Sequence, residues 1–463
     1  MKRYSITQTG LDFQIRETHE TLTSRSGLAI VQETAMALGI VRDIAEHLPQ
    51  PGSNRGFAPE EYVMPLVLMF CGGGRAMEEL REIKQDAGLR RLCNLDRIPS
   101  TDAFGTWLRN SQNLKGMKRV NEALVDQTLE RTAQDDFTLD TDATYLETEK
   151  NCAKVNYQGE KSFSILLSFI SNLDLCVRSD YRNGNISPAT GIADHLKYTL
   201  RLLKRHHKRL KHFRSDSAAY NSEVINLCMA PENRVIFTIT ADKDSAVKAA
   251  IKRIEPHEWQ RLRDRHGFDT GRQYATTIHT MEKTDNSYKL IVQRWPNPAY
   301  DLFTAAGVAD ERKQPSRTEV DGVPTPEAKP PEPFCYHVVA TSDNDRTPKE
   351  IIEFHNQRGD AENYNKEIKS GFGMDYAPSR KLAANAVWFE IGKLTYNLVI
   401  ALKRLLLEPT WWRKTIATLR WELLSIPGKV IRHGRQLYLR VVHRHCELLK
   451  KIRETLRVVL LPT

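Results

Sequence analysis

The pattern of apolar residues changes near residue 135, and this change constrains the fold of the chain more than any other feature. Beyond it, FTLDTDATYLE alternates apolar and polar residues, and SFSILLSFISN is a short apolar run. LCVRSDYRNGN follows and ends in turn-forming residues. Short runs of this kind, bounded by Asn and Gly, are typical of β-strands. The sequence therefore predicts three consecutive strands.

A helix and further strands are predicted after these three. ATGIADHLKYTLRLLKRHHKRL has apolar residues at helical spacing, HFRSDSAAYNSEVINLCM is typical of a strand, a turn and a helix, and NRVIFTITAD is typical of a strand. Three strands followed by helix, strand, helix and strand is the element order of the RNase H-like (retroviral-integrase-like) α/β fold. In that fold, acidic residues lie at strand ends and on a later helix.

Five regions are predicted along the chain. Helical spacing dominates before the core. QYATTIHTM and SYKLIVQRW are typical of paired strands, and ADERKQPSRTEVDGVPTPEAKPPEP is typical of an exposed loop. The regions are a helical domain for DNA contact or dimerisation (1–132), the first half of the core (133–240), a β-rich insertion with a Pro-rich loop (241–346), the second half of the core (347–408) and a basic C-terminal region (409–463).

Local signals place several helix ends. Ser100 or Thr101 is a candidate N-cap, and Thr347 with Glu350 forms a candidate capping box. The glycine triplet at 72–74 lacks the following G-K-[S/T] of a phosphate-binding loop, so it predicts a helix break. LAANAVWFEIGKLTYNLVIALKRLLL predicts a buried core helix.

The charge of the chain favours a polyanionic partner. The formal net charge is +10, and the Lys and Arg residues cluster in KRHHKRLKHFR, in LRRLC and in the C-terminal segment RHGRQLYLRVVHRHCELLKKIRETLR. Nucleic acid is the commonest partner of such a chain, because basic clusters bind phosphates. We therefore expect a DNA-binding protein.

Several features of the sequence predict that the protein is not exported from the cell. No run approaches the roughly 18 apolar residues that span a bilayer, and the N-terminus has no apolar signal-peptide core. The seven cysteines are dispersed without a C-x-x-C pair, and VVHRHC lacks a second ligand cluster for zinc. We expect reduced thiols, no membrane partner and a cytoplasmic location at the bacterial nucleoid.

Two aspartates stand out within the predicted strands. Asp142 lies in the first strand, in LDTDAT, and Asp216 ends a later strand, in HFRSDSAAY. Acids in apolar strands are costly unless they are paired or bind a metal. No local motif joins the two residues, so only the fold can bring them together. Asp140 lies two residues before Asp142 and would point to the same face of the strand, so it is an alternative first ligand.

The stretch HNQRGDAENYNKEIK adds a third acid. At 100° per residue, Arg358, Glu362 and Lys369 share one face of a helix, with His355 beside them. A break at Gly359 would leave only the relation between Glu362 and Lys369. An acid flanked by bases suits a metal-bound carboxylate beside phosphate-holding groups. It also suits a structural ion pair between Arg358 and Glu362.

This stretch resembles the Y-x2-R-x3-E-x6-K signature of DDE insertion-sequence transposases. Arg358, Glu362 and Lys369 match at the full spacing, whereas His355 stands where the family usually has Tyr. LDTDAT looks like the family's first-aspartate strand and RSDSAAY like its second, and the similarity runs from about 137 to 400. The resemblance implies that Arg358, Lys369 and His355 contact DNA phosphates.

The same resemblance implies a catalytic site and its cofactor. Asp142, Asp216 and Glu362 would be the catalytic residues and would hold two Mg²⁺ ions, with Mn²⁺ as a substitute. This agrees with chemistry, because clustered carboxylates repel without a cation and hard oxygen ligands select Mg²⁺. The implied activity is cut-and-paste DNA transposition, which consists of phosphodiester cleavage at transposon ends and 3′-hydroxyl strand transfer into target DNA.

The implied partner is double-stranded DNA, namely terminal inverted repeats and target DNA, bound by a homodimer in the synaptic complex. Two alternatives to a transposase are an RNase H-like structure-selective nuclease or resolvase, and a catalytically inactive DNA-binding protein derived from a transposase.

Two tryptophans, Trp259 and Trp295, lie in the predicted insertion. Their side chains would either pack the core of the insertion or stack on an extruded base.

Overall fold

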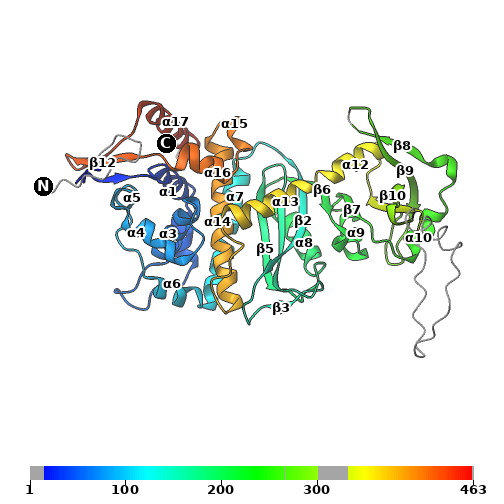
Figure 1. Cartoon of the computed structure of the whole chain (residues 1–463), viewed down its shortest axis with the longest axis horizontal. Coiled ribbons are helices and arrows are strands. Elements are labelled where there is room, and N and C mark those ends of the chain that lie inside the picture. The colour runs from blue at the N-terminus through cyan, green and yellow to red at the C-terminus, as the bar shows by residue number, and fades with distance from the viewer. Residues whose placement is uncertain (1–14, 265, 301–331, 461–463) are drawn as a thin grey trace, which may run out of the picture. The chain divides into compact units, whose positions relative to one another are not determined.

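The computed structural model describes residues 15–264, 266–300 and 332–460, and the chain divides into two compact units (Figure 1). The sheet unit is Thr132–Asn365, and the helical unit joins Met1–Arg131 to Lys366–Thr463. The boundary between Arg131 and Thr132 is close to residue 132, where the N-terminal region was expected to end. The predicted region 347–408, however, is divided at residue 365.

The sheet unit is built on one mixed sheet. In the described part of the chain, its order is β3-β4-β2-β6-β7-β11-β10-β9-β8, and β5 pairs with β4. The strands are β2 (Asp136–Glu147), β3 (Lys154–Val155), β4 (Lys161–Ile170), β5 (Leu175–Asn183), β6 (Arg209–Ser215), β7 (Ile236–Thr240), β8 (Gln260–Arg263), β9 (Asp269–His279), β10 (Tyr288–Pro296) and β11 (Phe334–Thr341).

The centre of this sheet follows the predicted order of elements. β2, β4 and β5 are the three consecutive strands, paired antiparallel, and β2, β6 and β7 pair in parallel. The parallel pairs need crossover connections, which α8 (Ile192–Arg205) and α9 (Ser222–Met229) supply. α8 packs on β2 and β6. The core of the unit therefore lies between these strands and their crossover helices.

The predicted insertion extends the same sheet. β9 and β10 pair antiparallel, as expected from their sequences, and β11 joins them to β7. α10 (Ser245–Lys252) packs against β9, and α12 (Pro348–Asn356) packs against β7, β9 and β10 (Figure 1). An apolar cluster lies beneath α12; its members are Leu262, Ile291, Val339, Ile351 and Ile352. Most of the predicted Pro-rich loop lies outside the described residues.

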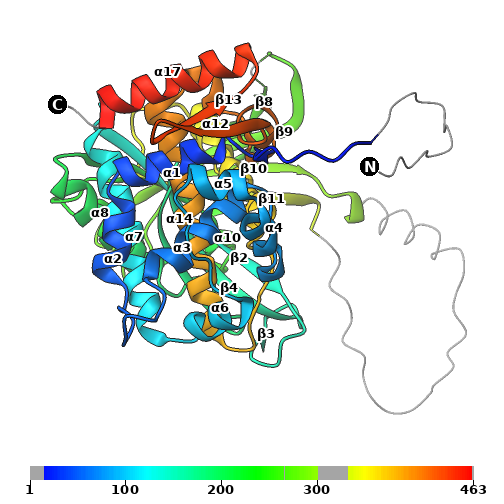
Figure 2. The same ribbon diagram turned by 90° about the vertical axis from the view of Figure 1, so that its left-hand side faces the viewer.

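The helical unit surrounds α14 (Leu382–Leu406). This helix is buried along nearly its whole length and packs against α1, α3, α6, α7 and α17 (Figure 2). The prediction of a buried core helix is confirmed. Because α14 is buried on nearly all sides, several helices must cover it, and it therefore belongs with the N-terminal helices rather than with the sheet.

The other elements of the helical unit surround this helix or flank it in sequence. The helices are α1 (Leu28–Ala37), α2 (Ile40–His47), α3 (Pro59–Cys71), α4 (Leu80–Gln85), α5 (Ala87–Leu92), α6 (Thr101–Leu108), α7 (Ser111–Glu130), α15 (Pro409–Trp412), α16 (Ile416–Leu419) and α17 (His443–Leu460). β1 (Leu22–Thr23), β12 (Gly428–His433) and β13 (Gln436–Arg440) form a small sheet. In the described part of the chain, no helix is long and apolar enough to cross a membrane.

The predicted helix ends are confirmed. Ser100, rather than Thr101, is the N-cap of α6, and its hydroxyl accepts a hydrogen bond from the Ala103 N–H. Thr347 caps α12, and the Glu350 carboxylate accepts from the Thr347 N–H at 2.8 Å. These caps satisfy N–H groups that have no partner within the helix.

Candidate active site

The sheet register brings Asp142 and Asp216 to one edge. Asp142 lies in β2, and Asp216 directly follows β6, the parallel neighbour of β2. Thr141 pairs with Ser215 across these strands, so the two aspartates are the next residues on adjacent strands. The Asp216 carboxylate also accepts a hydrogen bond from the Ala218 N–H at 3.1 Å, which orients it at the strand end.

Asp142 lies in the electrostatic field of both other predicted acids. Its side chain is 14% exposed. Burial and the charge of Asp216 raise the pKa of Asp142 to about 6; Arg358 opposes this rise and Glu362 adds to it. One carboxylate oxygen accepts a hydrogen bond from Nδ2 of Asn365 at 2.9 Å. The fold therefore brings the charges of Asp142, Asp216 and Glu362 together.

The helix predicted around Glu362 is broken. α12 ends at Asn356 and α13 (Gly359–Lys366) begins three residues later, so Arg358 lies in the turn between them. The expectation that Arg358 and Glu362 share a face of one helix is therefore wrong, and the alternative of a break is correct. The Arg358 guanidinium lies 4.0 Å from the Asp142 carboxylate. Glu362 is exposed in the first turn of α13.

Lys369 does not continue this helix with regular spacing. It lies in a π-helical turn, Glu367–Gly371, which belongs to the helical unit. A π-helix bonds residue i to residue i+5, so the 100° spacing that predicted a shared face with Glu362 does not extend to Lys369.

His355 is a buried side chain in this structure. It is 3% exposed, and its Nε2 lies 3.0 Å from the hydroxyl of Thr240. Burial, followed by the nearby His337 and Arg358, lowers the pKa of His355 to about 3. A buried, neutral imidazole is poorly suited to the phosphate contact predicted for this position.

Asp140 lies beneath the candidate site, paired with Arg214. Its carboxylate accepts two hydrogen bonds from the Arg214 guanidinium, at 2.7 and 2.8 Å, and both side chains are nearly inaccessible to solvent. Arg214 also donates to the Phe354 carbonyl at 2.9 Å and to the Gln357 side chain at 3.2 Å. Because Asp140 is committed to this pair, the geometry favours Asp142 as the acid at the open edge.

A hydrogen-bond chain fixes the opposite face of β2. The hydroxyls of Thr141 and Ser168 lie 2.7 Å apart, and the Ser168 hydroxyl lies 2.8 Å from Nδ1 of His195. Nε2 of His195 lies 3.0 Å from the carboxylate of Asp180. The Ser215 hydroxyl donates to the Thr141 carbonyl at 2.8 Å. The last contact joins β6 to β2 directly before the two aspartates, and the other contacts tie β2 to β4, α8 and β5.

Arg214 and Asn365 were missed in the sequence. The sequence held a signal for Arg214. Arg214 precedes Asp216 by two residues, as Asp140 precedes Asp142, so on neighbouring strands Arg214 and Asp140 would lie on the same face as the two candidate aspartates and could pair with each other. Recognising it required the pairing of β2 with β6. No comparable signal identifies Asn365.

The donor set suits a hard divalent cation, although the arrangement is open. In residues 15–264, 266–300 and 332–460, no group of three His, Cys, Asp or Glu side chains is placed to hold a metal ion. The three acids nevertheless offer carboxylate oxygens, the ligands that Mg²⁺ prefers. Burial, and after it the charge of Asp216, raises the pKa of Asp142, and a cation would offset the repulsion between the carboxylates.

The two predicted tryptophans face arginines in the extended part of the sheet. The Arg294 guanidinium lies 3.8 Å from the ring centre of Trp259, and the Arg272 guanidinium lies 4.5 Å from that of Trp295. Both rings are half-buried. Cation–π contacts of this kind hold the rings against the strands.

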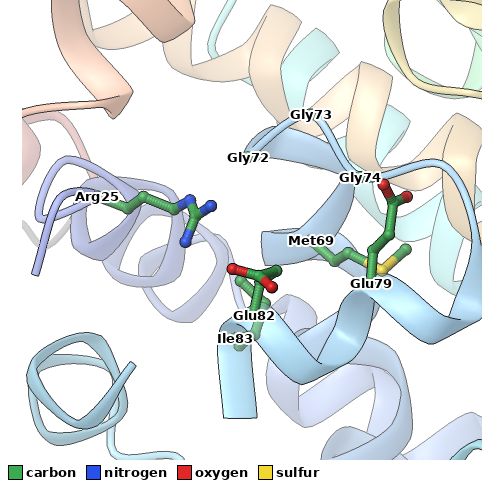
Figure 3. A pocket seen from close by; sticks show the side chains of 8 residues that line it. All are labelled: Arg25, Met69, Gly72, Gly73, Gly74, Glu79, Glu82 and Ile83. Carbon is green, nitrogen blue, oxygen red and sulfur yellow. The ribbon is translucent and has the colours of Figure 1, made fainter. Parts of the chain in front are cut away.

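The glycine triplet does not form a phosphate-binding loop. Gly72 ends α3 as its C-cap, and Gly73 has a φ of 101°, a left-handed conformation that favours glycine. A cavity of about 160 Å³ lies beside the turn. Its lining includes Arg25, Glu79 and Glu82 (Figure 3), and two carboxylates disfavour a bound phosphate. The predicted helix break is confirmed.

Comparison with known proteins identifies the family. A family model described as transposase DDE domain, group 1, matches residues 8–311 and 313–459. No curated protein matches the chain. Among solved structures, a piggyBac transposase synaptic complex with hairpin DNA is similar at 11% sequence identity, with a TM-score of 0.43, over 96% of this chain and 83% of that chain. Because the family match covers nearly the whole sequence, the chain belongs to the DDE transposases of group 1.

Proposed function

We propose that this transposase catalyses cut-and-paste transposition, cleaving phosphodiesters at transposon ends and transferring the 3′-hydroxyl ends into target DNA. The observation that carries the proposal is the adjacency of Asp142 and Asp216 on paired strands, with Glu362 on the helix that Asn365 bonds to Asp142. Asp142 and Asp216 follow a paired position on adjacent strands, and the charge of Glu362 acts on Asp142. Neighbouring carboxylates are the ligands that two-metal phosphodiester cleavage uses.

The topology supports an RNase H-like core. The order β5-β4-β2-β6-β7, with antiparallel pairs on one side of β2 and parallel pairs on the other, is the order expected for that fold. In this interpretation, β8–β11 are an insertion between the second aspartate and the glutamate. Because the inserted strands add to the edge at β7, they extend the core sheet instead of forming a separate module.

The proposed cofactor is Mg²⁺, as two ions, with Mn²⁺ as a substitute. Asp142, Asp216 and Glu362 would hold it. Bound there, the metal would activate the attacking hydroxyl and offset charge on the scissile phosphate. Asp216 is oriented by the Ala218 N–H, and Asp142 is held by Asn365, so the chain fixes two of the three carboxylates before any ligand arrives.

The basic residues of the site are proposed to hold DNA. Arg358, beside Asp142, would pair with a phosphate oxygen and stabilise the charge that develops there. Lys369 would contact a DNA phosphate. The net charge of +10 supports a nucleic-acid partner, which we propose to be double-stranded DNA, namely transposon ends and target. A homodimer in the synaptic complex and a cytoplasmic location at the nucleoid complete the proposal.

A joining assay tests this function. Purified protein is incubated with a labelled duplex that carries the ends of its own element, a plasmid target and Mg²⁺. We expect cleavage at the ends and joined products, both abolished by Asp142→Asn and Glu362→Gln. Glu232→Gln is the matched control, because Glu232 is an exposed acid elsewhere in the sheet unit. Cleavage without joining would instead indicate a structure-selective nuclease, and no cleavage would indicate a DNA-binding protein.

A further inference from the structure

Asn365 joins the helix that carries one predicted acid to the strand that carries another. It lies in α13 three residues after Glu362, so both side chains lie on one side of the helix. Its Nδ2 donates a hydrogen bond to the Asp142 carboxylate at 2.9 Å. Asn365 as a whole residue is 6% exposed, so this contact is largely shielded from water.

The other end of the same amide lacks a partner. Oδ1 of Asn365 is buried and has no hydrogen-bond partner among the described residues. The reverse orientation would place this oxygen against the oxygen of Asp142, so the amide is held with its N–H₂ on the acid. Buried carbonyl oxygens are rarely left unpaired. Where one is retained beside acidic groups, a cation or a water bound to a cation is the partner that its chemistry fits.

We propose that Asn365 is part of the divalent-cation site. Its Nδ2 orients the carboxylate of Asp142, and its Oδ1 supplies a neutral oxygen to the cation or to a water on it. This inference rests on the proposed function, which places the cation between Asp142, Asp216 and Glu362. An amide supplies an oxygen without adding negative charge. It therefore adds no repulsion among the carboxylates in the cation-free protein, as a fourth carboxylate would.

A structural role would have different consequences. If Asn365 only tied α13 to β2, its removal would lower stability without altering the affinity for a cation. Asn156 provides the matched control for that role: it is 5% exposed, its Oδ1 accepts from the Gln158 and Glu160 N–H groups, and its Nδ2 has no partner among the described residues. Its turn adjoins β4 at the end remote from the site.

The test measures binding of Mn²⁺ to the full chain without DNA, from the electron paramagnetic resonance signal of free Mn²⁺. We expect Asn365→Ala to raise the Kd for Mn²⁺ about tenfold or more, because groups that orient metal ligands contribute about 10–100-fold to affinity. Asn156→Ala should lower the Tm and leave the Kd unchanged. A Kd within twofold of wild type for a folded Asn365→Ala protein would overturn the inference.

Two further variants keep the outcomes separate. Asn365→Asp preserves the shape but places a second carboxylate against Asp142, so Mn²⁺ should raise its Tm more than it raises the Tm of the wild type. An equal Mn²⁺-induced shift would contradict the inference even if the alanine variant failed to fold. Asp142→Asn tests the underlying site. If this variant binds Mn²⁺ as the wild type does, the proposed function fails. If Asp142→Asn loses Mn²⁺ binding and Asn365→Ala keeps it, only the role of Asn365 fails.

Discussion

Asp140 and Asp142 differ by two positions in sequence but have separate roles in the structure. The period of a strand places both side chains on one face, so sequence reasoning kept both as candidates. The distinction comes from Arg214 on the neighbouring strand, which binds Asp140 through two hydrogen bonds. Such an assignment needs the strand register, which is a property of the whole sheet.

The first prediction concerns this buried pair. Asp140→Asn should lower the free energy of unfolding by about 3–5 kcal/mol, because it leaves the Arg214 charge buried without its partner. Replacing both residues, with Asp140→Leu and Arg214→Met, should cost less than the single change. Urea denaturation measures both values. The folded Asp140→Asn protein should retain Mg²⁺-dependent cleavage. Wild-type stability in Asp140→Asn would contradict the structural role of the pair.

The second prediction concerns pH and Asp142. Its folded-state pKa of about 6 lies above the unfolded value of about 3.9, so the folded protein binds the proton more tightly. The corresponding stability is fully present below about pH 4 and is lost as pH rises through 6, by up to about 3 kcal/mol. Urea unfolding in EDTA, compared with Asp142→Asn, should show this loss only in the wild type. Parallel pH profiles would contradict it.

At the scale of elements, local sequence predicted most of the structure. The period-two strands, the Ser100 and Thr347 caps and the apolar helix α14 all appear as expected. The break between α12 and α13 remained open in the sequence, because Gly359 weakens a helix without forbidding it. The π-helical turn around Lys369 was missed, since no local signal distinguishes it from regular helix.

The third prediction concerns the end of α3. The Arg420 guanidinium donates to the carbonyls of Phe70 and Cys71, at 2.7 and 2.8 Å, and so caps this helix beside the glycine triplet. Arg420→Met should cost about 1–3 kcal/mol, because the Cys71 carbonyl loses its guanidinium donor and the Phe70 carbonyl keeps only the Gly73 N–H. The exposed Arg413 provides the control, as Arg413→Met should leave the unfolding midpoint unchanged. Equal midpoints for the two variants would contradict the cap.

At the scale of the whole molecule, the sequence predicted the family, whereas it predicted five regions and not the two compact units of the structure. The expected second half of the core, 347–408, is divided because α13 docks on the sheet while α14 is buried among helices. The sequence of an apolar helix does not indicate which other segments it packs against, because this depends on tertiary packing. The adjacency of Asp142 and Asp216, which are distant in sequence, likewise became visible only with the sheet order.

The fourth prediction concerns the overall charge. A chain with a net charge of +10 that contacts several phosphates releases counterions on binding DNA. With 6–10 contacts, the affinity for duplex DNA should fall about 10³–10⁵-fold between 50 and 200 mM salt. Fluorescence anisotropy over this range measures the slope. An affinity that stays flat would contradict the electrostatic account of DNA binding.

Metal-directed cleavage of the protein backbone tests the central claim most directly. Fe²⁺, with ascorbate and peroxide, replaces Mg²⁺ and produces hydroxyl radicals that cut the chain near the bound metal. We expect cuts close to residues 142, 216 and 362, suppressed by excess Mg²⁺ and absent in Asp142→Asn. Cuts at any other set of positions, or cuts that persist in Asp142→Asn, would contradict the convergence of these acids around a divalent cation.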